Sequence, residues 1–222
     1  MNNKMKLLSS AVVHDVMVYD MHYKEHFMLS NDIKLLTGKP VSGRAFTVRG
    51  EFTFNRLADY EELARVIDML PHFTKGDIEV LQPGYGGPLG TWGGFTAKLV
   101  AKYGCRGAVV DGYTRDIGQL QQMEFSVFCK GTNLINGFGS GWQIVDFQSP
   151  IDMPGLLGTT VSVRPGDFIV GDEDGVVVVP TELLEEVVDH AHKRLAREDE
   201  LGALLDEDTL SLAEWKKTIF DW

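Results

Sequence analysis

The sequence predicts a single α/β domain spanning residues 1–222, with a core at about 42–180. Strand-like and helix-like hydrophobic patterns alternate through the first part of this core, an order typical of a parallel sheet with right-handed crossovers. The run GAVV at 107–110 is continuously apolar and therefore indicates a buried strand. No repeat or Pro/Ser-rich linker divides the chain, and 222 residues that are 44% hydrophobic suffice for a sizeable core.

The first expected element is an amphipathic helix at about residues 10–22. Its apolar positions recur at helical spacing, at Val12, Val13, Val16 and Met17. Ser9 or Ser10 precedes them, and serine is a residue type that caps helix N-termini. We expect this helix to pack on the sheet.

The core then follows in the order strand, helix, strand, glycine-rich loop, helix, strand, short helix, strand. The expected ranges are 43–50, 55–70, 76–82, 83–94, 95–104, 107–110, 117–122 and 125–131. Gly104 is the residue type expected just past a helix end. The stretch at 131–150 is too rich in glycine for a helix and is expected to wind over the surface.

The last part of the chain predicts a hairpin followed by a helical tail at about 182–220. Two strands flank the acidic turn GDEDG at 171–175, where Asp and Gly suit tight-turn dihedrals. Thr181 is expected to cap a long helix with one apolar face. The sequence SLAE at 211–214 is a capping box, which indicates the start of a final short helix.

The charge balance argues against nucleic-acid and membrane-surface partners. The chain has 21 basic and 32 acidic residues, a formal charge of -11, and no basic patch offsets this repulsion of phosphates. Cys105 and Cys129 lack the spacing of a zinc ribbon or disulfide scaffold, which fits a reducing cytoplasm. His14 and Asp15 interrupt the N-terminal apolar run before it reaches the length of a signal sequence or membrane span. We therefore expect a cytoplasmic protein.

The sequence DGYTRD at 111–116 directly follows the buried strand GAVV. Loops at the carboxyl ends of parallel strands form the ligand crevice of such sheets. Arg115 offers a rigid fork of donors for a carboxylate or keto oxygen, and Asp116 offers a hard oxygen ligand for Mg²⁺ or Mn²⁺. The alternative is a structural turn, in which Arg115 pairs with Asp111 and Asp116 stabilises a helix dipole.

The glycine-rich loop at 83–94 is the second candidate, because glycines let backbone N–H groups approach a phosphate or carboxylate at a helix N-terminus. Its spacing is not that of a dinucleotide site, since Leu89 stands where the third glycine of G-x-G-x-x-G belongs. A P-loop is also excluded, since no G-K-[ST] follows. Turns of the chain alone are the alternative.

Several segments together resemble the RraA-like family. They are SGRAFTVRG, GDIEVLQPG, TWGGFTAKLVAKYGCRGAVVDGYTRDIGQL, FSVFCKG and VSVRPGDFIVGDEDGVVVVP. The similarity runs in order from about Ser42 to Pro180, and its most specific elements are V-V-D-G-x-x-R-D and P-G-D-x-I-x-G-D-x-D-G-V-V-V-V-P. This family includes 4-hydroxy-4-methyl-2-oxoglutarate/4-carboxy-4-hydroxy-2-oxoadipate aldolases and a ribonuclease E inhibitor.

The resemblance implies a swivelling β/β/α sandwich with a C-terminal helical tail, a trimer or a hexamer of two trimers, and an active site between subunits. It also implies a small anionic 2-oxo acid as substrate and a divalent metal, usually Mg²⁺ or Mn²⁺, bound by Asp116. Arg115 matches the arginine that holds the keto acid and stabilises the pyruvate enolate. The loop that receives the substrate carboxylate matches the N–H groups of Gly93, Gly94, Phe95 and Thr96.

Two positions depart from the family pattern. In the aldolases an acidic residue twenty-one positions before the arginine supports the metal through water, and this chain has Gly94 there. Losing that carboxylate should weaken metal binding or remove a proton acceptor. The family also often has Gly-Arg where this chain reads GSGWQIVDF. A glutamate from the C-terminal helix of a neighbouring subunit can complete such sites, and here the resemblance implies Glu198 or Glu200.

The expected function is therefore a metal-dependent lyase of the aldolase or oxaloacetate decarboxylase type. In that chemistry the metal polarises the 2-oxo oxygen, so that cleavage of the C3–C4 bond leaves a stabilised enolate. Two alternatives stay open. One is a non-catalytic regulator that binds a protein partner, as the ribonuclease inhibitor branch does; the other is a different enolate-type reaction, a hydration or isomerisation, at the same metal site.

Overall fold

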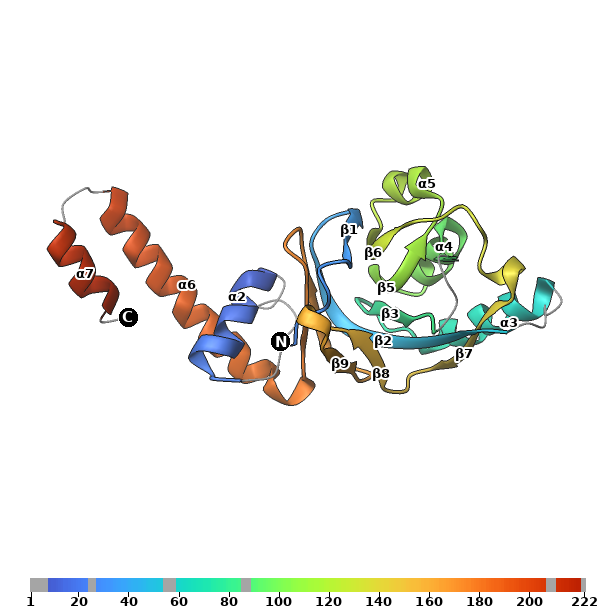
Figure 1. Ribbon diagram of the computed structural model, residues 1–222, viewed down its shortest axis with the longest axis horizontal. Coiled ribbons are helices and arrows are strands. Elements are labelled where there is room, and N and C mark those ends of the chain that lie inside the picture. The colour runs from blue at the N-terminus through green and yellow to red at the C-terminus, as the bar shows by residue number, and fades with distance from the viewer. Residues whose placement is uncertain (1–7, 24–26, 54–58, 85–88, 207–210, 221–222) are drawn as a thin grey trace.

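In the part of the chain that the structure describes, nine strands form a mixed sheet at the centre of the protein (Figure 1). The computed structural model describes residues 8–23, 27–53, 59–84, 89–206 and 211–220. The strands are β1 (Lys34–Thr37), β2 (Val41–Phe52), β3 (Ile78–Gln82), β4 (Gly90–Trp92), β5 (Gly107–Thr114), β6 (Ser126–Thr132), β7 (Trp142–Phe147), β10 (Phe168–Gly171) and β11 (Val176–Val179). They lie in the order β1-β6-β5-β3-β2-β10-β11, with β4 paired to β5 and β7 paired to β2.

Four neighbouring strands, β2, β3, β5 and β6, run parallel, which confirms the parallel sheet expected from the alternating pattern. In β5, Ala108 and Val110 pack in a cluster on one face of the sheet, while Val109 packs in a second cluster on the other. All three side chains are fully buried. The apolar run is continuous because helices cover one face and the hairpin of β8 (Ile151–Pro154) and β9 (Thr160–Val163) covers the other.

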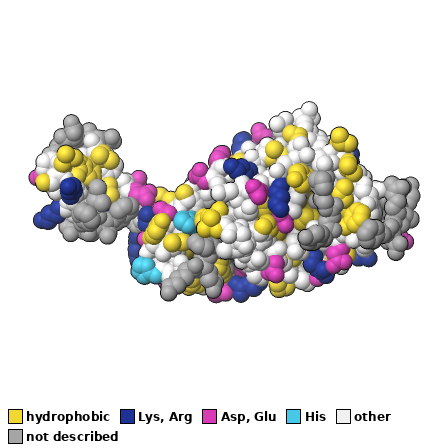
Figure 2. All heavy atoms as spheres, viewed as in Figure 1, with side chains coloured by type: hydrophobic (Ala, Val, Ile, Leu, Met, Phe, Trp, Pro, Cys, Tyr) yellow, Lys and Arg dark blue, Asp and Glu magenta, His cyan; other side chains and the backbone are white. Residues whose placement is uncertain are grey.

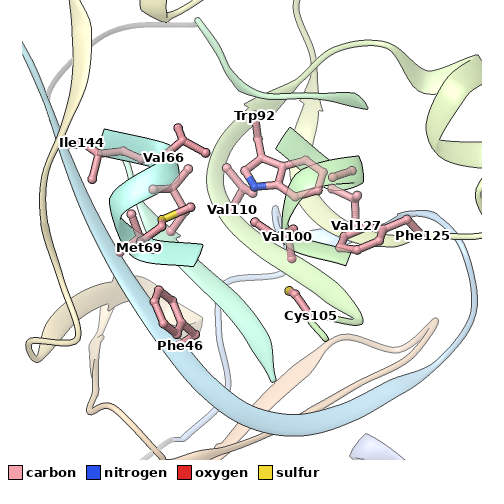
Figure 3. Close-up of a cluster of buried hydrophobic side chains, with 14 of the residues drawn as sticks. Phe46, Val66, Met69, Trp92, Val100, Cys105, Val110, Phe125, Val127 and Ile144 are labelled. Atoms are coloured by element: carbon pink, nitrogen blue, oxygen red, sulfur yellow. The ribbon is translucent and has the colours of Figure 1, made fainter. Parts of the chain in front are cut away.

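Three helices cover the first of these faces, namely α3 (Asp59–Met69), α4 (Gly94–Lys102) and α5 (Ile117–Gln122). Figure 3 shows part of this cluster, with Val66 and Met69 of α3 and Val100 of α4 pointing toward the strands. These helices and strands bring the amino ends of α4 and α5 to the same edge of the sheet, next to the carboxyl end of β5.

The C-terminus of α4 confirms the helix end expected at Gly104. Gly104 has φ +103°, in the left-handed region that glycine adopts most readily. Its N–H donates to the Ala101 carbonyl at 3.1 Å, and the Cys105 N–H donates to the Val100 carbonyl at 3.1 Å. This pair of hydrogen bonds is a Schellman motif, which satisfies two carbonyls at the end of α4.

The expectation that residues 131–150 wind over the surface is wrong for their second half. Residues 142–147 form β7, which pairs antiparallel with the last part of β2, and β8 begins at Ile151. Trp142 is buried, and its indole N–H donates to the Pro83 carbonyl at 2.8 Å. The glycines before Trp142 obscure a short strand whose partner lies about ninety residues earlier, so its pairing leaves no local pattern in the sequence.

The N-terminal helix begins as predicted and ends earlier. Ser9 accepts the Val12 N–H at 3.2 Å, as an N-cap does, and α2 (Ser10–Asp15) continues into a π-helical turn, η1 (Val16–Asp20). Its apolar side chains pack against the antiparallel hairpin of β10 and β11, the hairpin predicted around GDEDG. Asp172 in that turn fastens the helix, because it accepts both the N–H and the hydroxyl of Ser10, at 2.7 and 2.6 Å.

The helical tail consists of a 3₁₀ turn, η5 (Thr181–Leu183), followed by α6 (Leu184–Asp206) and α7 (Leu212–Phe220). Thr181 does not cap a helix as predicted, because its hydroxyl donates to the Gly166 carbonyl at 2.9 Å. The capping box is confirmed, since Ser211 N–H donates to Glu214 at 2.8 Å and Glu214 N–H faces the Ser211 hydroxyl at 3.4 Å.

The far half of α6, together with α7, projects from the body of the protein as a separate lobe (Figures 1 and 2). Leu205 and Leu212 are exposed on this lobe. Among the helices that the structure describes, none combines the length and apolar character needed to cross a membrane.

Candidate functional site

The connection between β5 and α5 places Arg115 and Asp116 at the carboxyl end of the parallel sheet. The strand is longer than GAVV indicated and continues through Thr114, so only these two residues link the two elements. The backbone of Arg115 is fixed, because its N–H donates to the Trp92 carbonyl at 3.0 Å. Asp116 has φ 63° and ψ 35°, a left-handed conformation that is uncommon outside glycine and concentrates at functional sites.

The carboxylate of Asp116 faces the N-terminus of α4. Its Oδ2 accepts the Gly94 N–H at 3.2 Å, and its Oδ1 lies 3.4 Å from Arg115 Nε. Asp116 therefore does not cap its own helix, α5, with its side chain. Gly93 leaves room for this arrangement, since a Cβ at that position would lie 2.9 Å from both Arg115 Cγ and Asp116 Oδ2.

The first turn of α4 offers further donors. In the part of the chain that the structure describes, the N–H groups of Phe95 and Thr96 have no hydrogen-bond acceptor. Unpaired N–H groups and the positive end of the helix dipole together favour an anion. The resemblance implied that this turn receives a carboxylate, and its geometry suits that role.

These groups line a cavity of about 460 Å³. Its polar side chains are Thr91, Thr96, Arg115, Asp116 and Asn136. The side chains of Arg115 and Asp116 are 36% and 37% exposed, so both are accessible from solvent. The side chains of Leu63, Val66 and Phe138 form part of the apolar wall of the cavity. A few charged groups on a partly apolar cavity are typical of a site for a small polar molecule.

Asn136 and Phe138 were not predicted. They belong to the loop after β6, the strand that neighbours β5, so this loop lies at the same edge of the sheet. Backbone hydrogen bonds fasten the loop to Gly90, whose N–H donates to the Ile135 carbonyl at 2.9 Å and whose carbonyl accepts the Gly137 N–H at 3.0 Å. The rule that places ligands at the carboxyl ends of parallel strands applies here too and could have identified Asn136.

Asp111 takes no part in this cavity. Its carboxylate pairs with Lys130 of the neighbouring strand β6, at 2.5 Å between Oδ1 and Nζ. The structural alternative for DGYTRD is therefore correct for Asp111, although the partner is Lys130 and not Arg115. Arg115 itself forms its ion pair with Asp116.

Asp116 is the one carboxylate among the described residues that line the cavity, and its hard oxygens suit a divalent cation. Among the described residues, no group of three or more His, Cys, Asp or Glu side chains converges, so these residues form no closed metal cage within one chain. Asp116 supplies one carboxylate, and the amide oxygen of Gln119 occupies the space into which a side chain at position 94 would project. Mg²⁺ suits so few protein ligands, because it keeps several waters and binds through one or two carboxylates plus substrate oxygens.

Glu198 and Glu200 do not reach this cavity within one chain. Both lie on α6, where Glu198 pairs with Arg194 at 3.4 Å and Glu200 pairs with Arg197 at 3.0 Å. The helix projects away from the sheet edge that carries Arg115 and Asp116 (Figure 1). A contribution from either glutamate requires a neighbouring subunit.

Glu79, the second residue of β3, is 1% exposed and contacts Trp92, which lines the cavity. Its Oε1 accepts the Trp92 indole N–H at 3.2 Å, and in the described part of the chain its Oε2 has no hydrogen-bond partner. Burial raises the pKa of Glu79 to about 7, and the Trp92 hydrogen bond offsets part of this effect. Cys105 and Cys129 are also buried, and burial raises the pKa of both thiols, which keeps them in the unreactive thiol form.

Comparison with known proteins gives one family. The RraA-like family, described as Aldolase/RraA, matches residues 10–178. A putative 4-hydroxy-4-methyl-2-oxoglutarate aldolase of Halalkalibacterium halodurans is 33% identical over 120 residues, which cover 54% of this chain and 54% of that protein. The match therefore spans about half the length of that relative.

Two further relatives extend this comparison. A 4-hydroxy-4-methyl-2-oxoglutarate aldolase of Thermus thermophilus is 30% identical over 145 residues, covering 64% of this chain and 83% of that protein. The crystal structure of Streptomyces coelicolor RraAS2, described as an unusual member of the RNase ES inhibitor RraA protein family, superposes with a TM-score of 0.76 at 24% identity. That superposition covers 90% of this chain and 96% of the other, and shows a shared fold.

Proposed function

Because this chain belongs to the RraA-like family, we propose that it is a divalent-metal-dependent lyase that cleaves or decarboxylates a small 2-oxo acid. The observation that carries the proposal is the placement of Arg115 and Asp116 side by side at one cavity, opposite the unpaired N–H groups of α4. A cation, a guanidinium and a helix N-terminus are complementary to a 2-oxo carboxylate and to the enolate that forms from it. The aldolase names of two relatives agree with this reaction class.

In this proposal each group of the chain has a separate task. The N–H groups of Phe95 and Thr96 bind the substrate carboxylate, and Arg115 donates to the 2-oxo oxygen. Charge on that oxygen grows as the C3–C4 bond breaks, so the Arg115 hydrogen bonds strengthen toward the transition state. Asp116 would hold Mg²⁺ or Mn²⁺, which when bound supplies a Lewis acid that polarises the same carbonyl.

A neighbouring subunit completes the site in this proposal. We propose a trimer, or a hexamer of two trimers, in which Glu198 or Glu200 of one chain approaches Asp116 of the next. The projecting lobe of α6 and α7 supports this arrangement, since it carries both glutamates away from their own sheet (Figure 1). Exposed Leu205 and Leu212 on the same lobe offer apolar surface for a subunit contact.

Pyruvate release from oxaloacetate, or from a 4-hydroxy-2-oxo dicarboxylate, tests the proposal in the presence of Mg²⁺ or Mn²⁺. Arg115→Ala should lower kcat/KM by ~10²- to 10³-fold, the usual effect of removing one donor to a developing oxyanion. Arg106→Ala removes an exposed arginine at the other end of β5 and should leave turnover unchanged. Full turnover by Arg115→Ala, or by the parent protein in excess chelator, would contradict the proposal.

A second candidate is a regulator that binds a protein partner without catalysis. The observation that favours it is the lack of converging acidic groups around Asp116 among the described residues. Calorimetric titration with Mg²⁺ and then oxalate, an enolpyruvate mimic, distinguishes the two candidates. Binding of oxalate that depends on the metal supports the lyase, whereas no binding of either supports the regulator.

A further inference from the structure

Gly94 is not required by the conformation of the backbone. It is the first residue of α4, it follows the extended Gly93, and it does not belong to the residues with positive φ. Any amino acid can adopt such a conformation, and most are better than glycine in a helix. The reason for glycine must lie in what a side chain would meet.

A side chain at position 94 would meet Gln119. An added Cβ would overlap the amide oxygen Oε1 of Gln119 and would lie 2.7 Å from its Cδ and 3.1 Å from its Cγ. The Gln119 amide thus fills the volume from which a side chain at position 94 would begin. Gly94 and Gln119 are therefore sterically complementary, and the side-chain oxygen at this place comes from α5 and not from α4.

Gln119 is held in register with Asp116. Asp116 directly precedes α5 and Gln119 lies in its first turn, where the Gln119 N–H donates to the Asp116 carbonyl at 2.9 Å. The next residue, Leu120, is fully buried and anchors the turn in the core. In the described part of the chain the side-chain amide of Gln119 makes no hydrogen bond, so its oxygen keeps its full capacity as an acceptor.

We propose that Gln119 is the second oxygen donor of the metal site, in place of an acid at position 94. This inference rests on the proposed function. Asp116 directly precedes α5 and Gln119 lies in it, and both face the N-terminus of α4: Asp116 accepts the Gly94 N–H, and the Gln119 amide occupies the position of a Cβ at Gly94. An amide oxygen is a hard ligand of the kind that Mg²⁺ and Mn²⁺ accept, either directly or through a bound water.

The presence of Gln119 in place of an acid at position 94 changes the charge of the proposed metal site. A glutamine is neutral, so a site built from Asp116, Gln119 and Arg115 carries one negative charge fewer than a site with a further acid. The cation is held more weakly as a result, and the loaded site attracts anions more strongly.

Titration calorimetry with MnCl₂, alone and with oxalate, tests the inference on the full-length protein. Gln119→Ala should weaken Mn²⁺ binding by ~10- to 100-fold, the usual effect of losing a group that supports a metal. Gln119→Glu should strengthen it, because a carboxylate replaces the amide. The matched controls are Gln121→Ala and Gln121→Glu, which make the same changes at an exposed position of the same helix and should leave the affinity within twofold of the parent.

A double-mutant cycle with position 94 tests the steric part. Gly94→Ala should displace the Gln119 amide and weaken Mn²⁺ binding as Gln119→Ala does, while the fold is retained because only the end of a flexible side chain has to move. The double variant should then show no further loss, since the two changes remove one interaction. Additive losses would contradict the proposed pairing of Gly94 with Gln119.

The outcomes separate this inference from the proposed function. If the parent binds Mn²⁺ and Asp116→Ala does not, but Gln119→Ala binds as well as the parent, the role of Gln119 is refuted and the lyase proposal stands. If the parent binds no Mn²⁺ even with oxalate present, both proposals are overturned.

Discussion

Replacing Glu79 by glutamine should flatten the dependence of protein stability on pH. Glu79 is buried in β3 with one oxygen bonded to Trp92, and burial raises its pKa from 4.5 to about 7. The folded protein therefore holds a proton on Glu79 more tightly than the unfolded chain does. The stabilisation from this proton is fully present below about pH 4.5 and is lost as the pH rises to about 7.

The size of the effect follows from the same two values. The difference between 4.5 and about 7, at ~1.4 kcal/mol per pH unit, corresponds to about 3 kcal/mol of unfolding free energy. About 2 kcal/mol of this falls between pH 5.5 and pH 8, a range that avoids the isoelectric point near 4.9. Glu79→Gln removes the titrating proton. It also puts an amide N–H₂ in the place of Oε2, where the described residues offer no hydrogen-bond partner, and this buried group lowers the unfolding free energy by about 1–3 kcal/mol at every pH.

Urea unfolding, followed by tryptophan fluorescence at one protein concentration, measures this prediction at pH 5.5 and pH 8. The loss of stability between the two pH values should be about 2 kcal/mol smaller in Glu79→Gln than in the parent. Glu173→Gln makes the same change at an exposed position and should keep the parental dependence. If Glu79→Gln loses as much stability between the two pH values as the parent, Glu79 does not titrate in this range and the reasoning is refuted.

Two further changes test how the fold is held together. Asp172→Ala removes both acceptors of Ser10 and should lower the unfolding free energy by ~2–4 kcal/mol. The N-terminal helix should also become more sensitive to protease. Stability and protease resistance equal to those of the parent would show that the apolar contacts of α2 suffice. Gly104→Ala places a Cβ on a residue with φ +103°, 2.8 Å from Lys75 Cα, so it should lower the unfolding free energy by ~1–3 kcal/mol. The control Gly118→Ala, whose Cβ would meet no atom within 4 Å, should be neutral or slightly stabilising. The melting temperature of Gly104→Ala should therefore be the lower of the two, and equal values would contradict the prediction.

Features that depend on neighbouring residues could be predicted from the order of amino acids. The caps at Ser9 and Ser211 and the helix end at Gly104 follow from side-chain and backbone chemistry within a few positions, and the structure confirms all three. The parallel strands could also be predicted, because a strand buried on both faces must be apolar throughout, as GAVV is. Arg115 and Asp116 are consecutive in the sequence, and their place after a parallel strand indicated the edge of the sheet on which they lie.

The surroundings of those two residues depend on contacts between distant parts of the chain and became visible in the fold. The pairing of β7 with β2, the approach of the Asn136 loop to Gly90 and the position of Glu79 behind Trp92 join segments far apart in the chain. Compared with the family pattern, position 94 lacks an acid, and only the packing of α5 against α4 shows that the Gln119 amide occupies the space beside Gly94. Hydrophobic periodicity reports which face of an element is buried, but the direction of a polar side chain depends on where the neighbouring element crosses it.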